Sequence, residues 1–243
     1  ASAHHWTEAR VCKGDNPSVI ILYNTTFGST YPTESMQEYQ YADTSWSLER
    51  LVQYYTKKNL AHGIDWRYKK SDGTLIPRIW GREVLNWTSH CPRGLYGNSK
   101  YLTARQFIQY KALPSIMSDT KFRNSYDGII FDTYPTSNCW DSSYDGIDYN
   151  YDGIEDDCYR VMSSEEAAGL NPWSINVVSN TRELFNYFVN PAPRNFITMY
   201  GQDLIYSDAK SNFNGWKSEG WMTQDGAAQQ GSKWLRVWDG VYN

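Results

Sequence analysis

Short apolar segments alternate with helical periodicity along this chain. Six segments have the apolar, β-branched or aromatic character of strands: residues 19–23, 63–68, 83–87, 126–132, 195–200 and 216–221. Between them, apolar residues fall at helical spacing over residues 45–55, 101–117 and 171–188, and Pro114 predicts a kink or stop in the second of these helices. Such alternation predicts an α/β fold, in which helices cover a parallel sheet.

A (β/α) barrel and an open doubly wound sheet both satisfy this pattern. No G-x-G-x-x-G or G-x-x-x-x-G-K-[ST] motif follows a predicted strand, so a nucleotide-binding sheet has little support. We therefore expect a single barrel-like domain over residues 1–243. We count five or six strands, whereas a complete barrel has eight and takes about 250 residues. A complete and an incomplete barrel thus remain as alternatives.

An acidic seven-residue repeat occupies residues 139–158, after the predicted strand 126–132, and forms an insertion in the domain. Its units place an acid at the first position and an oxygen-bearing side chain at the third. Asp145 or Asp152 occupies the fifth position, and a glycine follows it directly in the sequence. Oxygen ligands at alternate positions, closed by a turn glycine, are what a hard cation needs from a short loop. Without a cation, these carboxylates repel one another.

We therefore predict that this loop binds one or two calcium ions. The predicted side-chain ligands are Asp141, Ser143, Asp145, Asp148, Asn150, Asp152 and Asp156. The stretch resembles the calcium loops of dockerins and of thrombospondin type 3 repeats, which also read D-x-[DN]-x-D-G. It departs from the EF-hand, because Tyr159 stands where that motif has a bidentate glutamate. The alternative is a solvated acidic loop without a metal.

Aromatic residues are abundant, since the chain contains 11 Trp, 20 Tyr and 8 Phe. Such side chains fill a large core or line a surface that stacks on sugar rings, and composition leaves both alternatives open. The net charge of −4 and the lack of a Lys/Arg cluster argue against nucleic-acid binding. No apolar run approaches the roughly 18 residues of a membrane span.

The four cysteines match no zinc-ligand spacing and are predicted to form disulfides. Cys139 and Cys158 bracket the acidic repeat, so a bond between them would close it into a loop. Cys12 and Cys91 are the remaining pair, although four cysteines allow three connectivities.

The same features indicate an oxidising, extracellular compartment. Disulfides and a calcium loop are typical of secreted proteins, and N-x-[ST] sequons occur at Asn24 and Asn86. The first residues read Ala-Ser-Ala, without an initiator methionine or an apolar signal, as expected of a processed or excised chain. We therefore predict a secreted protein.

The middle of the chain resembles a family of glycoside-hydrolase barrels. Residues 79–132 hold a strand ending in Val-Leu-Asn-Trp-Thr, a Cys-Pro pair, a helix, and then Tyr-Asp-Gly-Ile-Ile-Phe-Asp. This order is similar to that of the barrels related to endo-α-1,4-polygalactosaminidases, which carry a DG-[IV]-F-x-D-[NT] strand at the fourth barrel position. That family tends to have an N-G-x-x-x-E strand two units later, and residues 214–219 match that spacing. The resemblance covers roughly residues 63–221.

This resemblance implies two carboxyl groups that face each other across a sugar-binding cleft. One donates a proton to the glycosidic oxygen, while the other acts as nucleophile or activates water. Asp132 and Glu219 are the candidates, each at a predicted strand end. The alternatives are a structural or calcium-binding carboxylate at Asp132 and an exposed loop acid at Glu219. Asp65, Glu83 and Asp203 are weaker candidates near other predicted strands.

Trp66, Trp87, Tyr134 and Trp221 are candidates for stacking on sugar rings, and a place in the core is the alternative for each. The sequence thus predicts a secreted, calcium-stabilised, glycoside-hydrolase-like protein that acts on or binds an extracellular polysaccharide. One alternative is a non-catalytic structural subunit that assembles as a homo-oligomer or filament. A sugar-binding module without the facing carboxylate pair is another, because fold alone does not decide function.

Overall fold

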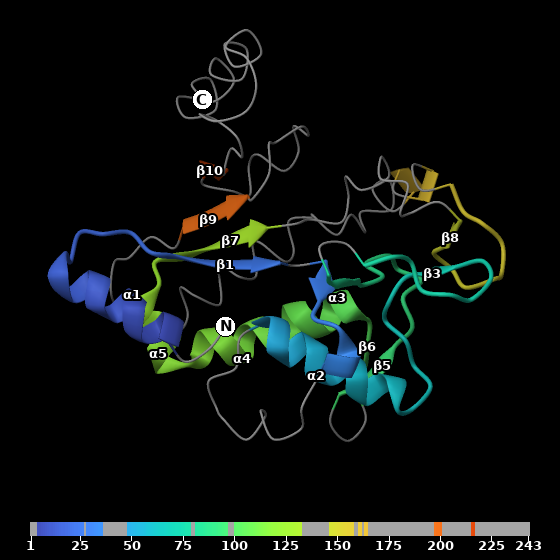
Figure 1. Ribbon diagram of the computed structural model, residues 1–243, viewed down its shortest axis with the longest axis horizontal. Coiled ribbons are helices and arrows are strands. Elements are labelled where there is room, and N and C mark those ends of the chain that lie inside the picture. Colours follow the sequence, from blue (N-terminus) through green and yellow to red (C-terminus); the bar gives the residue numbers. More distant parts are fainter. Residues whose placement is uncertain are drawn as a thin grey trace, which may run out of the picture.

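The computed structural model describes residues 4–26, 28–35, 48–78, 81–96, 100–132, 146–157, 160–161, 163–164, 197–200 and 215–216. Its largest sheet has four parallel strands (Figure 1). In spatial order they are β1 (Leu22–Thr26), β7 (Gly128–Asp132), β9 (Ile197–Tyr200) and β10 (Gly215–Trp216). Each overlaps a strand segment predicted from the sequence. Closure of such a sheet into a barrel stays a prediction.

Helices lie along one side of this sheet. The described helices are α1 (His4–Asp15), the 3₁₀-helix η1 (Thr33–Ser35), α2 (Leu48–Leu60), α3 (Ala104–Phe107), the π-helix η3 (Ile108–Ala112), α4 (Leu113–Ser118) and α5 (Thr120–Ser125). In Figure 1, α2, α4 and α5 lie below the sheet. The predicted helix over residues 171–188 lies outside the described residues.

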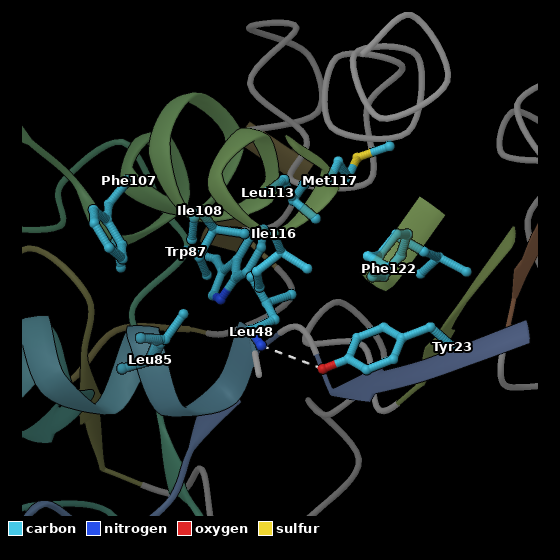
Figure 2. Packing of buried hydrophobic residues seen from close by; sticks show 14 of the residues in the cluster. Tyr23, Leu48, Leu85, Trp87, Phe107, Ile108, Leu113, Ile116, Met117 and Phe122 are labelled. Atoms are coloured by element: carbon cyan, nitrogen blue, oxygen red, sulfur yellow. Dashed lines mark hydrogen bonds between the residues drawn. The ribbon is translucent and has the colours of Figure 1, made fainter. Parts of the chain in front are cut away.

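The sheet packs on the helices through alternate residues of its strands. Tyr23 of β1 and Ile129 of β7 are partners in the parallel register, and both are buried in the main hydrophobic cluster. The Tyr23 ring packs edge-on against Phe122 of α5, with centroids 5.5 Å apart. Its hydroxyl donates to Glu49 Oε2 at 3.1 Å and accepts from the backbone N–H of Leu48 at 3.2 Å (Figure 2). Burial therefore raises the pKa of this phenol well above its ordinary value.

Three short antiparallel ladders flank the sheet. They pair β2 (Ser29–Thr30) with β4 (Glu83–Val84), β3 (Lys69–Lys70) with β8 (Ile147–Asp148), and β5 (Gly94–Tyr96) with β6 (Lys100–Leu102). A second hydrophobic cluster joins the first two ladders, and it consists of Tyr68, Ile76, Val84, Ile147 and Tyr149.

The predicted strands 63–68 and 83–87 do not join the parallel sheet of the described structure, where β1 pairs directly with β7. Instead, Arg67 and Leu85 form an antiparallel bridge. A tight turn follows the first of these segments: Gly73 has a φ of +83°, its N–H donates to the carbonyl of Lys70 at 2.8 Å, and Lys69 forms an antiparallel bridge with Leu75. The chain therefore folds back on itself, and local antiparallel pairing replaces a parallel crossover.

The predicted helix over residues 101–117 continues past Pro114, and a π-helix directly precedes α4, which contains the proline. A capping box between Thr103 and Gln106 starts α3. Pro114 lies in the first turn of α4, directly after the π-helix, and the N–H of Leu113 donates to the carbonyl of Ile108. Since proline has no N–H to donate, the wider π turn lets the helix continue through this position.

Candidate functional site

Asp132 is the last residue of β7, the strand that lies between β1 and β9. Its backbone pairs with Thr26 at the end of β1, while Phe131 pairs with Tyr200 at the end of β9. Parallel strands end at the same edge of a sheet, and that carboxyl edge is where α/β folds bind ligands. In Figure 1 the arrowheads of β1 and β7 point towards the side of the molecule that holds β3 and β8.

The other predicted members of the sugar site lie outside the described residues. These are Glu219, Tyr134 and Trp221. Glu219 follows the end of β10 by three residues, and β10 is two strands away from β7 in the sheet order.

Trp66 and Trp87 do not form a sugar-stacking surface. Both indole rings are 0% exposed and belong to the main hydrophobic cluster. The Trp66 ring lies 5.5 Å from that of Phe107, and Figure 2 shows Trp87 among the helix residues Ile108 and Leu113. A ring with no exposed face has no surface for a sugar, so this prediction is wrong for both residues.

A partly buried ion cluster contains two of the weaker carboxylate candidates. The guanidinium of Arg67 binds both oxygens of Asp65, from Nε at 2.8 Å and from Nη2 at 3.0 Å, and its Nη1 donates to Glu83 Oε1 at 2.9 Å. The backbone N–H of Thr33 donates to the second Glu83 oxygen at 3.1 Å. We call Asp65, Arg67 and Glu83 the Arg67 cluster.

The electrostatics of the Arg67 cluster favour the ionised form of Asp65. Burial raises the pKa of Asp65, but hydrogen bonds and charge from Arg67, together with the charge of Lys69, outweigh burial and leave that pKa below its ordinary value. Burial lowers the pKa of Arg67, but its two carboxylate partners outweigh burial and leave that pKa above its ordinary value. A carboxylate fixed in this way is a poor proton donor, so Asp65 has a structural role. Arg67 was not singled out from the sequence, although its i, i+2 spacing from Asp65 places both on one side of an extended segment.

The described half of the acidic repeat, residues 146–157, is called the acidic loop below. Asp148 is 4% exposed, and its two oxygens accept from the N–H groups of Asp152 at 3.2 Å and Gly153 at 2.8 Å. Asn150 Nδ2 donates to Asp152 Oδ2 at 3.0 Å, and Asp156 Oδ2 accepts from the N–H of Tyr149 at 2.8 Å. The carboxylates of the loop therefore accept hydrogen bonds from N–H groups of the loop itself.

The acidic loop carries carboxylate and amide oxygens, which are the ligand type that calcium takes, but its described carboxylates do not converge into a ligand cluster. Within the described residues, no group of three or more His, Cys, Asp or Glu side chains could hold a metal. The predicted ligands Asp141, Ser143 and Asp145 lie outside the described residues. An ionised carboxylate has about four lone-pair sites, so the two N–H contacts of Asp148 leave acceptor capacity for a cation.

The predicted Cys12–Cys91 disulfide is absent from the structure. Both residues are free thiols, with Cys12 exposed on α1 and Cys91 buried in the main cluster. Burial raises the pKa of the Cys91 thiol to about 12, so this sulfur stays protonated and unreactive at neutral pH. The predicted partners Cys139 and Cys158 lie outside the described residues.

The two sequons have different surroundings. Asn24 is exposed on β1, whereas Asn86 is 0% exposed. The amide of Asn86 donates to the Tyr149 carbonyl, and its oxygen accepts from the N–H and hydroxyl of Thr88. A glycan on Asn86 is incompatible with this packing, so only the sequon at Asn24 still bears on an extracellular location.

Comparison of the chain with protein-family models, with curated proteins and with solved structures gave no match. Among the helices of the described residues, none has the length and apolar character to cross a membrane.

Proposed function

We propose that this protein is a secreted, calcium-stabilised, glycoside-hydrolase-like protein that acts on or binds an extracellular polysaccharide at the carboxyl edge of its parallel sheet. The observation that carries the proposal is the position of Asp132, which ends the strand between β1 and β9. An acid at the end of an interior parallel strand is where this class of fold places catalytic groups.

Glu219, three residues after the end of β10, is the proposed second carboxyl group. Neighbouring strands lie about 4.8 Å apart, so the ends of β7 and β10 are separated by roughly 10 Å. We propose a spacing of about 6.5–9.5 Å between the carboxyl groups of Asp132 and Glu219, which is the range that an inverting mechanism needs. One carboxylic acid then protonates the leaving oxygen, and the other carboxylate removes a proton from the attacking water.

Calcium is the second part of the proposal. The acidic loop offers carboxylate and amide oxygens at alternate positions, and it lies at the side of the molecule towards which β7 points (Figure 1). Bound calcium would neutralise the acids around Asp148 and stabilise the loop next to the carboxyl edge.

Paired variants test the proposed activity. We expect the native protein to release reducing ends from one member of a polysaccharide panel that includes galactosamine-containing polymers. Asp132→Asn and Glu219→Gln should each lower turnover by about 10²-fold or more, the loss expected for a catalytic acid or base. Asp72→Asn, which removes an exposed acid in the 70–74 turn, is the matched control and should leave turnover unchanged. Equal turnover in all four proteins would reject the carboxylate pair.

A non-catalytic assembly subunit is the second candidate, and one observation favours it. Within the described ranges, no strand pairs with the outer side of β1, and an unpaired strand edge readily pairs with another chain. Sedimentation equilibrium separates the candidates, since an assembly subunit forms oligomers whose mass rises with concentration, whereas a closed or covered sheet stays monomeric.

A further inference from the structure

Two segments of the chain carry no acidic residue, although the whole chain contains 27 Asp and Glu against 23 Lys and Arg. They are residues 50–64, which include most of α2, and residues 84–118, which run from the end of β4 to the end of α4. Both segments still carry cations: Arg50, Lys57, Lys58, Arg93, Lys100, Arg105 and Lys111. Positive charge is therefore concentrated in two stretches of a chain that is acidic as a whole.

The fold brings these two segments together. Asn59 Oδ1 of α2 accepts from the N–H of Leu95 of β5 at 2.7 Å. The Phe107 ring of α3 is buried and packs against rings from both segments, with its centroid 4.7 Å from that of Tyr55 and 5.6 Å from that of Tyr96. In Figure 1, β5 lies beside α2. Residues far apart in the sequence thus form one surface to which neither segment contributes an acid.

Tyrosine rings line the junction of the two segments. Tyr54 and Tyr55 of α2 have ring centroids 5.1 Å apart, and the Tyr55 centroid lies 5.0 Å from that of Tyr96 of β5. Lys58 Nζ lies over the Tyr55 ring, 5.8 Å from its centroid, and Lys111 Nζ lies over the Tyr96 ring, 5.3 Å from its centroid. None of these five residues is buried, and we call them the tyrosine–lysine face.

The two lysines of the face keep their capacity to bind an anion. Among the ion pairs of the described residues, none joins a carboxylate to Lys58 or Lys111. A contact between an ammonium group and a ring face uses none of the N–H donors of that group. These donors therefore remain for an acidic ligand that lies against the same rings.

The chemistry of the tyrosine–lysine face selects a class of ligand. Tyrosine rings pack against the flat apolar faces of sugar rings, and their hydroxyls form hydrogen bonds at the rim. Ammonium groups bind carboxylates and sulfates. A polymer of sugar rings with acidic groups spaced along it matches this alternation of rings and cations. Duplex nucleic acid is a poorer match, because it carries one negative charge per about 1.7 Å.

We propose that the tyrosine–lysine face binds an acidic polysaccharide, whose sugar rings stack on the tyrosines and whose acidic groups pair with the two lysines. The absence of acids from residues 50–64 and 84–118 favours the approach of such a polymer. This inference goes beyond the proposed function, because it needs neither the Asp132–Glu219 pair nor calcium.

Binding of the full chain to immobilised polymers tests the proposal. Polygalacturonate supplies carboxylates, dextran sulfate supplies sulfates, and dextran is the neutral control. All binding is measured in EDTA, so that calcium plays no part. We expect the native protein to bind at least one acidic polymer about tenfold or more tightly than dextran, and the tighter of the two identifies the acidic group. Salt raised from about 50 to 200 mM should weaken this binding.

Variants locate the binding on the tyrosine–lysine face. The double variant Lys58→Gln, Lys111→Gln should bind the acidic polymer about tenfold more weakly and with a smaller dependence on salt, which a merely structural role of the lysines would not change. Lys121→Gln, at an exposed lysine of α5, is the matched control and should bind as the native protein does. Tyr54→Ala should weaken binding by roughly threefold to tenfold and leave the salt dependence unchanged.

Native affinity in the double lysine variant would overturn the proposal, as would equal binding of dextran and the acidic polymers or no binding of any polymer. Tighter binding of single-stranded oligo(dT) than of either acidic polysaccharide would assign the face to nucleic acid instead. The turnover of Asp132→Asn and Glu219→Gln is measured separately, so failure of the proposed activity leaves the result for this face unchanged.

Discussion

At the scale of single residues, charge and burial decide which side chains are reactive. Arg67 lowers the pKa of Asp65, and it forms ion pairs with both Asp65 and Glu83, which expose 12% and 4% of their side chains. Burial raises the pKa of the Cys91 thiol, because apolar surroundings disfavour the charged thiolate. Neither environment could be inferred from the sequence, since each depends on residues brought together by folding.

Removing Arg67 should destabilise the protein strongly. Arg67→Ala leaves Asp65 and Glu83 without their shared counter-charge, which costs about 3–5 kcal/mol of unfolding free energy. Urea denaturation followed by tryptophan fluorescence measures this loss. Arg93→Ala is the control at an exposed arginine, and a loss no larger than that of the control would contradict the structural role of the cluster.

Acid should weaken the protein through Asp65. Its pKa is lower in the folded than in the unfolded chain, so its stabilising contribution is present above the unfolded pKa of about 3.9 and is lost as the pH falls through the lower folded pKa. Unfolding free energies measured from pH 5 to 2 should therefore fall less steeply for Asp65→Asn than for the native protein. Parallel curves would show that Asp65 titrates normally.

Cysteine labelling should distinguish the two described thiols. Iodoacetamide at pH 8 should modify Cys12, which is exposed, and leave Cys91 unmodified until the protein unfolds. Peptide mapping by mass spectrometry identifies each site. Rapid native-state labelling of Cys91 would contradict its place in the core.

At the scale of elements, local signals predict strands better than they predict strand partners. The segment 126–132 has β-branched and aromatic residues that end in an acid, and it forms the interior strand β7. Segments 63–68 and 83–87 have similar composition, yet their partners are antiparallel. Tertiary contacts decide pairing, so composition cannot. The same limit applies to Trp66 and Trp87, whose burial depends on the helices that cover them.

The β5–β6 ladder provides a packing test at this scale. A Cβ added to Gly94 would lie 2.5 Å from side-chain atoms of Asn59, whose Oδ1 accepts from the N–H of Leu95 at 2.7 Å. Gly94→Ala should therefore cost about 1–3 kcal/mol, as overpacking does. In Gly14→Ala on α1, the added Cβ meets no atom within 4 Å, so thermal denaturation should show no loss for this control.

At the scale of the whole molecule, the proposed function has two parts: a sugar site at the carboxyl edge of the parallel sheet and a calcium site in the acidic loop. The position of Asp132 at a strand end was predictable because a strand followed by an acid is a local pattern. The contacts of the loop with Asn86 and Arg67 were not, because 60 or more residues separate the partners along the chain.

Removing calcium should lower the stability of the native protein. A ligand present at 100 times its dissociation constant contributes about 2.7 kcal/mol, and a chain of this size loses roughly 2–4 °C of melting temperature per kcal/mol. EDTA should therefore lower the melting temperature by about 5–10 °C, and added calcium chloride should restore it. A melting curve that EDTA does not shift would contradict the calcium proposal.

The most direct test of the proposed function is the distance between the carboxyl carbons of Asp132 and Glu219 in a crystal structure of the native protein. We predict about 6.5–9.5 Å across a cleft open to solvent at the carboxyl edge of the sheet. Carboxyl groups that point into separate environments, or a cleft filled by a neighbouring copy of the chain, would contradict the hydrolase account and favour the assembly subunit.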